Sequence, residues 1–181
     1  MQHRTEPVGD RANRSEKPMV GIVMGSDSDL PVMKEVLQVL ESFDIPAEIT
    51  VASAHRSPRR VAEYVRSANE RGLKVIIAGA GGAAHLAGVL AAETNLPVIG
   101  VPIGSSPLGG WDALLATVQM PAGVPVATMA VGTAGAKNAA ILAAQMLALT
   151  DAELQGRLRR HKEELADKVA DRAKKVQEQL R

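Results

Sequence analysis

The chain has 181 residues, 46% of them hydrophobic and 23% charged, with 21 Lys and Arg against 20 Asp and Glu. This composition is typical of one globular domain, and the absence of cysteine excludes disulfides, zinc ribbons, iron–sulfur clusters and thiol catalysis. The net charge of +1 and the scarcity of aromatic residues argue against nucleic acid as a partner. No apolar run is long enough to cross a bilayer, so no membrane partner is expected.

Three segments follow one another along the chain. Residues 1–17 are polar and mixed in charge, without the apolar segment of a secretory signal, and they predict a disordered leader on a cytoplasmic protein. Residues 18–150 have the length of one domain and are rich in Ala, Val and Gly. We expect them to form a catalytic α/β domain, followed by a C-terminal helix over residues 151–181.

The middle segment alternates strand and helix signals. Short β-branched runs predict strands at residues 19–24, 48–52, 74–78, 97–101 and 125–131. Apolar spacing and composition predict helices at residues 30–43, 58–71, 83–93, 112–118 and 136–149. Apolar strands alternating with helices indicate a parallel sheet covered on both faces, and right-handed crossovers make it a three-layer, doubly wound sheet. We expect the flavodoxin-like strand order 2-1-3-4-5.

The last segment has no proline and no glycine after Gly156, which predicts one long helix. A pair of apolar residues recurs along it every 11 residues: Leu154 and Leu158, Leu165 and Val169, Val176 and Leu180. An 11-residue repeat keeps such pairs on one face of a nearly straight helix. The narrow stripe fits equally well against its own subunit or against another one.

In a doubly wound sheet the ligand binds beyond the carboxyl ends of the strands, at the switch point between strands one and three. The loop after the first strand reads GSDSD, residues 25–29. Ser26 and Ser28 can present hydroxyls to an anion at a helix start, and Asp29 can accept hydrogen bonds from sugar hydroxyls. From this loop alone a purely structural role, in which these side chains cap the helix and its backbone groups, is favoured.

The loop after the second strand reads SAHRSP, residues 53–58. Arg56 offers a fork of donors suited to phosphate, and His55 can give or take a proton near neutral pH. A His-Arg pair at the end of an apolar strand is a poor choice for a core, so here a functional role is favoured.

The loop after the third strand reads AGAGGAAH, residues 78–85. It matches the dinucleotide fingerprint only formally, because it follows the third strand and no acid lies in residues 97–111. The alternative is a smooth wall of small residues that lets backbone N–H groups approach a planar or anionic group. His85 is as consistent with a packed residue as with a functional one. No metal site and no cofactor are expected, since neither His55 nor His85 has a carboxylate at ligand spacing.

Together, these three loops resemble the signatures of class I, bacterial-type N5-carboxyaminoimidazole ribonucleotide mutases. The stretch VQMP at residues 118–121 and residues 123–127 and 132–142 match as well, so the resemblance covers about residues 18–150. It implies an isomerase that moves a carboxylate from the exocyclic nitrogen of the ribonucleotide to ring carbon C4 in purine biosynthesis. It also implies a homo-octamer with sites at subunit contacts. The chain departs from the family pattern at Ala87, where Pro is usual, and at Leu30, where Trp is frequent.

The resemblance also assigns roles to residues. By this resemblance, the 5′-phosphate is bound by Ser26, Ser28 and Arg56, the ribose is bound by Asp29, and His55 is the acid/base. By the same resemblance, the migrating carboxyl group is held against a wall of small residues at Ala80 and Gly81, with Ser53 and His85 nearby. Two alternatives stay open: a related carboxylase that acts on another phosphorylated ring, and a nucleotide binder without catalytic activity.

Overall fold

A computed structural model describes residues 17–180. Its sheet has five parallel strands in the order β2-β1-β3-β4-β5, which confirms the predicted topology. The strands are β1 (Val20–Met24), β2 (Ala47–Val51), β3 (Val75–Gly81), β4 (Val98–Ile103) and β5 (Ala127–Thr128). The disordered leader expected over residues 1–17 lies outside the described residues, apart from Lys17, and stays a prediction.

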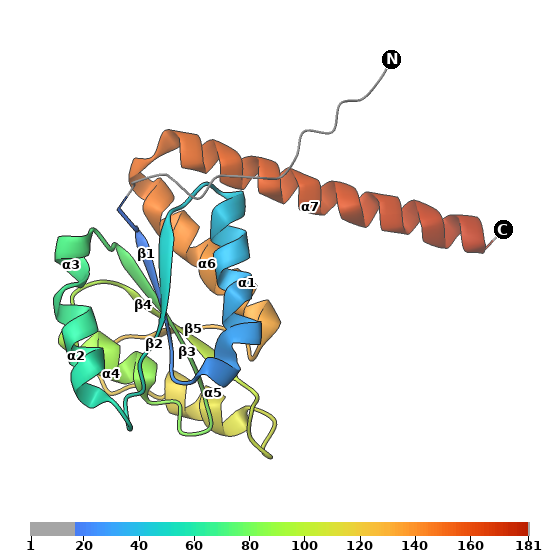
Figure 1. Ribbon diagram of the computed structural model, residues 1–181. Helices are drawn as coiled ribbons and strands as arrows, with labels where there is room; N and C mark the ends of the chain where they lie inside the picture. Colours follow the sequence, from blue (N-terminus) through green and yellow to red (C-terminus); the bar gives the residue numbers. More distant parts are fainter. Residues whose placement is uncertain (1–16, 181) are drawn as a thin grey trace.

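Helices cover both faces of this sheet (Figure 1). The α-helices are α1 (Leu30–Ser42), α2 (Pro58–Arg66), α3 (Ala68–Arg71), α4 (Leu86–Glu93), α5 (Trp111–Val118), α6 (Thr133–Leu147) and α7 (Ala152–Gln179). Helices α1 and α6 pack together on one face, and α2, α3 and α4 cover the other. The three-layer, doubly wound α/β prediction is therefore confirmed.

The two faces of the sheet are buried in separate apolar clusters because successive strand residues point in opposite directions. On β3, Val75 and Ile77 pack with α1 and α6, while Ile76 and Ala78 pack with α2 and α4. All four are at most 1% exposed. A sheet buried on both faces holds the ends of its strands rigidly, and those ends carry the loops of interest.

Several element ends differ from the prediction for local reasons. The helix expected at 58–71 is divided at Ser67, whose hydroxyl donates to the carbonyls of Glu63 and Tyr64. Helix α4 begins three residues later than expected, after Gly82 turns the chain with φ +57°. Strand β5 is only two residues long, and its partner strand contains Pro102, which has no N–H to donate to a neighbour.

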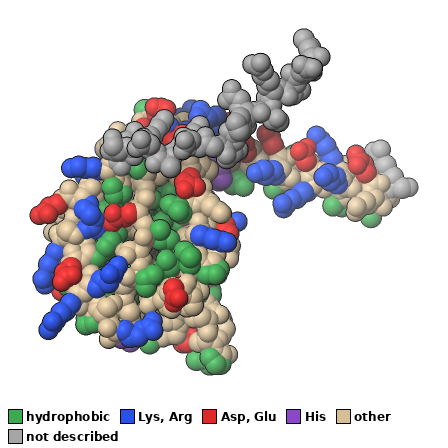
Figure 2. All heavy atoms as spheres, in the orientation of Figure 1, with side chains coloured by type: hydrophobic (Ala, Val, Ile, Leu, Met, Phe, Trp, Pro, Cys, Tyr) green, Lys and Arg blue, Asp and Glu red, His purple; other side chains and the backbone are tan. Residues whose placement is uncertain are grey.

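Helix α7 starts on the domain and then leaves it (Figure 1). Asp151 caps its first turn by accepting the N–H of Leu154 at 2.9 Å. Leu154 is buried, and the rings of Phe43 and His161 meet edge to face with their centroids 5.3 Å apart. Farther along, the predicted stripe is exposed, with Val169 64% accessible, and interleaved Lys, Arg, Asp and Glu side chains flank it (Figure 2). Only the first turns of α7 therefore pack against the domain of their own subunit.

Candidate functional site

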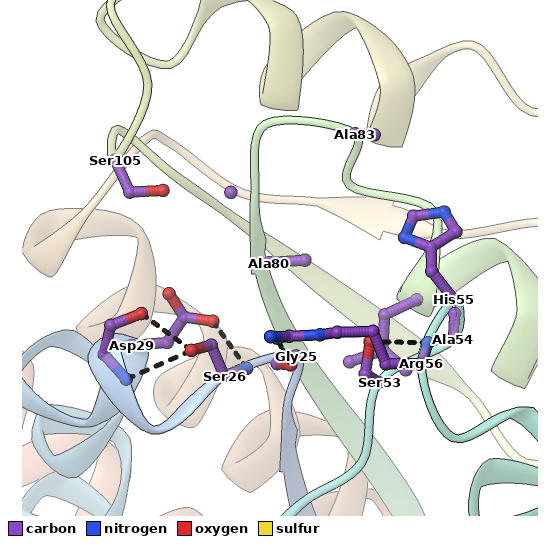
Figure 3. A pocket seen from close by; sticks show the side chains of 13 residues that line it. Gly25, Ser26, Asp29, Ser53, Ala54, His55, Arg56, Ala80, Ala83 and Ser105 are labelled. Atoms are coloured by element: carbon purple, nitrogen blue, oxygen red, sulfur yellow. Dashed lines mark hydrogen bonds between the residues drawn. The ribbon is translucent and has the colours of Figure 1, made fainter.

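A cavity of about 160 Å³ opens at the carboxyl ends of β1, β2 and β3, with a further wall from the loop after β4 (Figure 3). Its lining residues are Gly25, Ser26, Ser28, Asp29, Ser53, Ala54, His55, Arg56, Ala80, Gly81, Ala83, Leu86 and Ser105. All of the predicted site residues except His85 belong to this lining, and His85 bonds to one of its members. The three loops that the topological rule indicates therefore line one cavity.

The GSDSD loop forms a short 3-10 helix, η1 (Asp27–Asp29), that leads into α1. Ser26 and Asp29 form a capping box: the Ser26 hydroxyl accepts the N–H of Ser28, and Asp29 Oδ2 accepts the N–H of Ser26 at 3.2 Å. The Ser28 hydroxyl donates to that of Ser26 at 2.9 Å. The structural role considered from the sequence is therefore present, but Ser26 and Ser28 still line the cavity and stay available to a ligand.

Asp29 is a buried carboxylic acid, only 4% exposed. Burial raises the pKa of its carboxyl because removal from water disfavours the charged form. The N–H of Ser26 and the positive charge of Arg56 act in the opposite direction, and Asp27 adds to the rise. A buried carboxylate that keeps an acceptor oxygen toward a cavity is suited to bind hydroxyl groups.

Arg56 connects the loop after β2 to the loop after β1. Its guanidinium donates to the carbonyl of Gly25 at 3.2 Å, and its backbone N–H donates to the Ser53 hydroxyl at 3.2 Å. The Ser53 N–H in turn donates to the Ser57 hydroxyl at 2.9 Å, which tightens the turn before α2. The guanidinium therefore lies over the GSDSD loop, where it and the two serines of that loop can surround one anion (Figure 3).

His55 and His85 form a pair that the sequence did not reveal. Nε2 of His55 lies 2.8 Å from Nδ1 of His85, and the rings meet edge to face with centroids 4.9 Å apart. One hydrogen lies between these two nitrogens, so one ring donates and the other accepts. The partner of His85 is therefore the proposed acid/base rather than a backbone carbonyl, and a functional role for His85 stays a prediction.

The end of β3 forms the small-residue wall. Ala80 and Gly81 line the cavity, and Gly81 has no room for a side chain because a Cβ there would overlap the Ser105 hydroxyl. Gly79 serves packing, since its Cβ would collide with the Met33 side chain of α1. The first glycine of this formal fingerprint therefore faces the core.

Five lining residues were not predicted: Gly25, Ala54, Ala83, Leu86 and Ser105. Gly25 and Ala54 lie inside the GSDSD and SAHRSP motifs, Ala83 lies inside AGAGGAAH, and Leu86 follows that motif directly. Ser105 comes from the loop after β4, which the switch-point rule does not include. Its sequence signal was a stretch of Gly, Ser and Pro at residues 104–110 directly after an apolar strand.

Two features are absent from the described residues, 17–180. These residues contain no cluster of three or more His, Asp or Glu side chains placed to hold a metal ion. They also contain no helix that is both long and apolar enough to span a membrane.

The family model for AIR carboxylase matches residues 19–168. The chain belongs to the AIR carboxylase family. It is 57% identical to the N5-carboxyaminoimidazole ribonucleotide mutase of Pyrococcus horikoshii, over 91% of this chain and 92% of that protein. The proteins of the same name from Mycobacterium tuberculosis and Bacillus subtilis are 55% and 53% identical, over 90% and 86% of this chain and 92% and 96% of theirs.

Solved structures of this family share the fold. The crystal structure of Treponema denticola PurE superimposes with a TM-score of 0.79 at 28% identity, covering 88% of this chain and 98% of that one. A variant of PurE2 from the same organism gives 0.81 at 27% identity, over 89% and 99%. This AIR carboxylase family member therefore has the family's fold over most of its length.

Proposed function

We propose that this AIR carboxylase family member is an N5-carboxyaminoimidazole ribonucleotide mutase of purine biosynthesis. The reaction moves a carboxylate from the exocyclic nitrogen of the ribonucleotide to ring carbon C4. The observation that carries the proposal is the convergence of an arginine, a bonded histidine pair and a wall of small residues on one cavity. The 51–60% identity to curated relatives of that name supports the same activity.

One end of the cavity is suited to the phosphate and ribose. Arg56 and the hydroxyls of Ser26 and Ser28 offer donors from two loops. Asp29 lies behind them as an acceptor for ribose hydroxyls. Binding the non-reacting part of the substrate here fixes the position of the ring relative to His55.

The histidine pair can supply the proton that the reaction needs and take it back. His55 gives a proton to the exocyclic nitrogen as the bond from that nitrogen to the carboxyl carbon breaks, which releases carbon dioxide. Ring carbon C4 then attacks the carbon dioxide, and the proton on C4 passes to His55, so protons balance over the cycle. When His55 is protonated on both nitrogens, its Nε2–H donates to Nδ1 of His85, which holds the ring in place.

Carbon dioxide is small and neutral and must be retained between the two steps. Ala80 and Gly81 allow the wall of the cavity to approach it closely and leave little room for water. A site that holds both fragments gains the advantage of an intramolecular reaction, so neither ATP nor biotin is required.

We propose further that the protein forms the expected homo-octamer with its sites at subunit contacts. Trp111, Leu115 and Val118 lie on one side of α5 and are 69%, 53% and 49% exposed, next to Leu108 at 63%. A cluster of this kind is unusual on a surface that faces only water. The cavity of about 160 Å³ is also small beside the roughly 300–1,000 Å³ of typical ligand sites, which suits a site completed by a neighbour. A cytoplasmic location remains a prediction.

The substitution His55→Asn tests the catalytic assignment. We expect turnover to fall at least about 100-fold, as for the loss of a general acid/base, while substrate still binds. His161→Asn is a matched control because His161 packs on Phe43, away from the cavity. Unchanged turnover in His55→Asn would reject the mechanism. A wild-type protein that binds the ribonucleotide without converting it would favour the non-catalytic binder.

A further inference from the structure

The loop after β4 places one serine directly over the small-residue wall. In the register of the sheet Gly81 is paired with Ile103, so Ser105 stands two residues beyond the end of that pairing. A Cβ on Gly81 would overlap the Ser105 hydroxyl, which shows how closely this hydroxyl covers the wall. In Figure 3 Ser105 and His55 lie on opposite sides of the cavity, with Ala80 between and below them.

The hydroxyl of Ser105 differs from the other serine hydroxyls of the cavity. Those of Ser26, Ser28 and Ser53 all make hydrogen bonds within their own loops. The Ser105 hydroxyl makes none with any of residues 17–180, although it lines the cavity. Its backbone is fixed by its N–H, which donates to the carbonyl of Ile103 at 3.0 Å. It is therefore a positioned donor without a protein acceptor.

The neighbouring Ser106 has the opposite arrangement. Its hydroxyl donates to Asp112 Oδ1 at 2.9 Å and accepts the N–H of Leu108 at 3.2 Å. It does not line the cavity, and it ties the loop to the start of α5. The two serines thus have different roles. Ser106 holds the loop in place, and Ser105 faces the cavity beside the small-residue wall.

We propose that Ser105 contacts the substrate, donating a hydrogen bond from its hydroxyl to an oxygen of the carboxyl group that migrates. This inference rests on the proposed mutase function, which places that group against Ala80 and Gly81. The hydroxyl stands across the cavity from His55, so it can hold the carboxyl oxygens while His55 handles the proton. Its effect is to keep carbon dioxide over C4 between the breaking of one bond and the formation of the next.

The test compares Ser105→Ala, Ser105→Thr and Ser106→Ala in the full-length protein, with the carboxyl carbon of the substrate isotopically labelled. Measured quantities are kcat, KM and the fraction of label lost to dissolved carbon dioxide per turnover. We expect Ser105→Ala to lower kcat by about 10- to 100-fold, the usual effect of losing a hydrogen bond to a charged group. KM should change by less than about threefold, and label loss should rise several-fold. Ser105→Thr, which keeps the hydroxyl, should recover most of the activity.

Ser106→Ala reports the effect of loosening the loop alone, and it should retain the label as the wild-type protein does. Thermal unfolding confirms that each variant folds, which is expected because Ser105 is exposed. Wild-type kcat and label retention in Ser105→Ala would overturn the inference and leave the mutase function intact. Equal label loss in Ser106→Ala would also overturn it, in favour of a loop effect. If the wild-type protein does not convert the substrate, the proposed function fails and the inference fails with it.

Discussion

Burial of Asp29 lowers the stability of the folded protein at neutral pH, although the same residue is predicted to bind the ribose. The pKa of its carboxyl is raised by burial, so between the unfolded and folded pKa values the folded protein binds more protons than the unfolded chain. The free energy of unfolding contributed by this group therefore falls as pH rises through that interval, which starts near the ordinary value of 3.8. Asp29 is thus a residue at which function and stability conflict.

Asp29→Asn should consequently stabilise the protein at pH 7 and weaken substrate binding. The amide removes the buried charge and keeps an oxygen for the Ser26 N–H. Thermal unfolding from pH 3 to pH 8 should show a higher Tm for the variant at pH 7, with the difference disappearing below pH 3.8. KM should rise about 10- to 100-fold through loss of a charged acceptor. A variant that is less stable than wild type at pH 7 would contradict the argument.

Arg56 is predicted to bind phosphate through its fork of donors. Arg56→Lys keeps the charge and loses the fork, so we expect KM to rise about tenfold with a smaller change in kcat. Arg60→Lys is a matched control, because Arg60 donates to the Val51 carbonyl and the Thr50 hydroxyl of β2. Steady-state kinetics measure both KM values. Similar KM values for the two variants would show that Arg56 does not bind the phosphate.

At this residue scale, the sequence predicted which loops meet, but not every contact between their side chains. The strand-end rule was enough to bring Arg56 and the GSDSD serines together, because it depends only on topology. The contact between His55 and His85 depends on the shapes of two loops 30 residues apart, which no local pattern encodes. Ser105 was missed for a related reason: its position follows from the register of β3 against β4.

At the scale of elements, two glycines in helices are predicted to respond oppositely to the same substitution. Gly135 lies in α6, where a Cβ would overlap the backbone carbonyl of Ala130. Gly156 lies in α7, where a Cβ would meet only the Arg160 side chain at 3.8 Å. Gly135→Ala should destabilise the protein by about 1–3 kcal/mol or more, since a backbone atom cannot move aside.

Gly156→Ala should instead stabilise α7, by about 0.5–1 kcal/mol, because alanine loses less backbone freedom in a helix. Denaturant unfolding of both variants checks the pair. Destabilisation by Gly156→Ala would mean that α7 has a close contact at this position in the assembled protein.

Element order and type followed from the alternation of apolar runs, whereas element ends depended on local tertiary detail. The strand predicted at 125–131 is shortened to Ala127–Thr128, beside a strand that contains Pro102. The helix predicted from residue 136 begins at Thr133, where Gly132 supplies a turn with φ +77°. In both cases the controlling residue is visible in the sequence, but its effect depends on which strand lies beside it.

For the whole molecule, the exposed apolar side chains of α5 predict an assembly. Light scattering should give a particle of about eight times the 19.0 kDa chain mass. Trp111→Asp places a charge in the exposed cluster and should shift the protein to smaller species, with lower activity if neighbours complete the site. Leu149→Asp, at an exposed apolar residue between α6 and α7, serves as the comparison. A monomeric wild-type protein with full activity would contradict the octamer proposal.

The central claim is that the carboxyl group moves within one molecule, and one measurement tests it most directly. The C4-carboxylated ribonucleotide, labelled in its carboxyl carbon, is converted in reverse by the purified protein in the presence of unlabelled bicarbonate. A mutase that retains carbon dioxide at the Ala80–Gly81 wall predicts that the label stays on the ribonucleotide. Full exchange of the label with dissolved carbon dioxide or bicarbonate would contradict the account and identify a carboxylase instead.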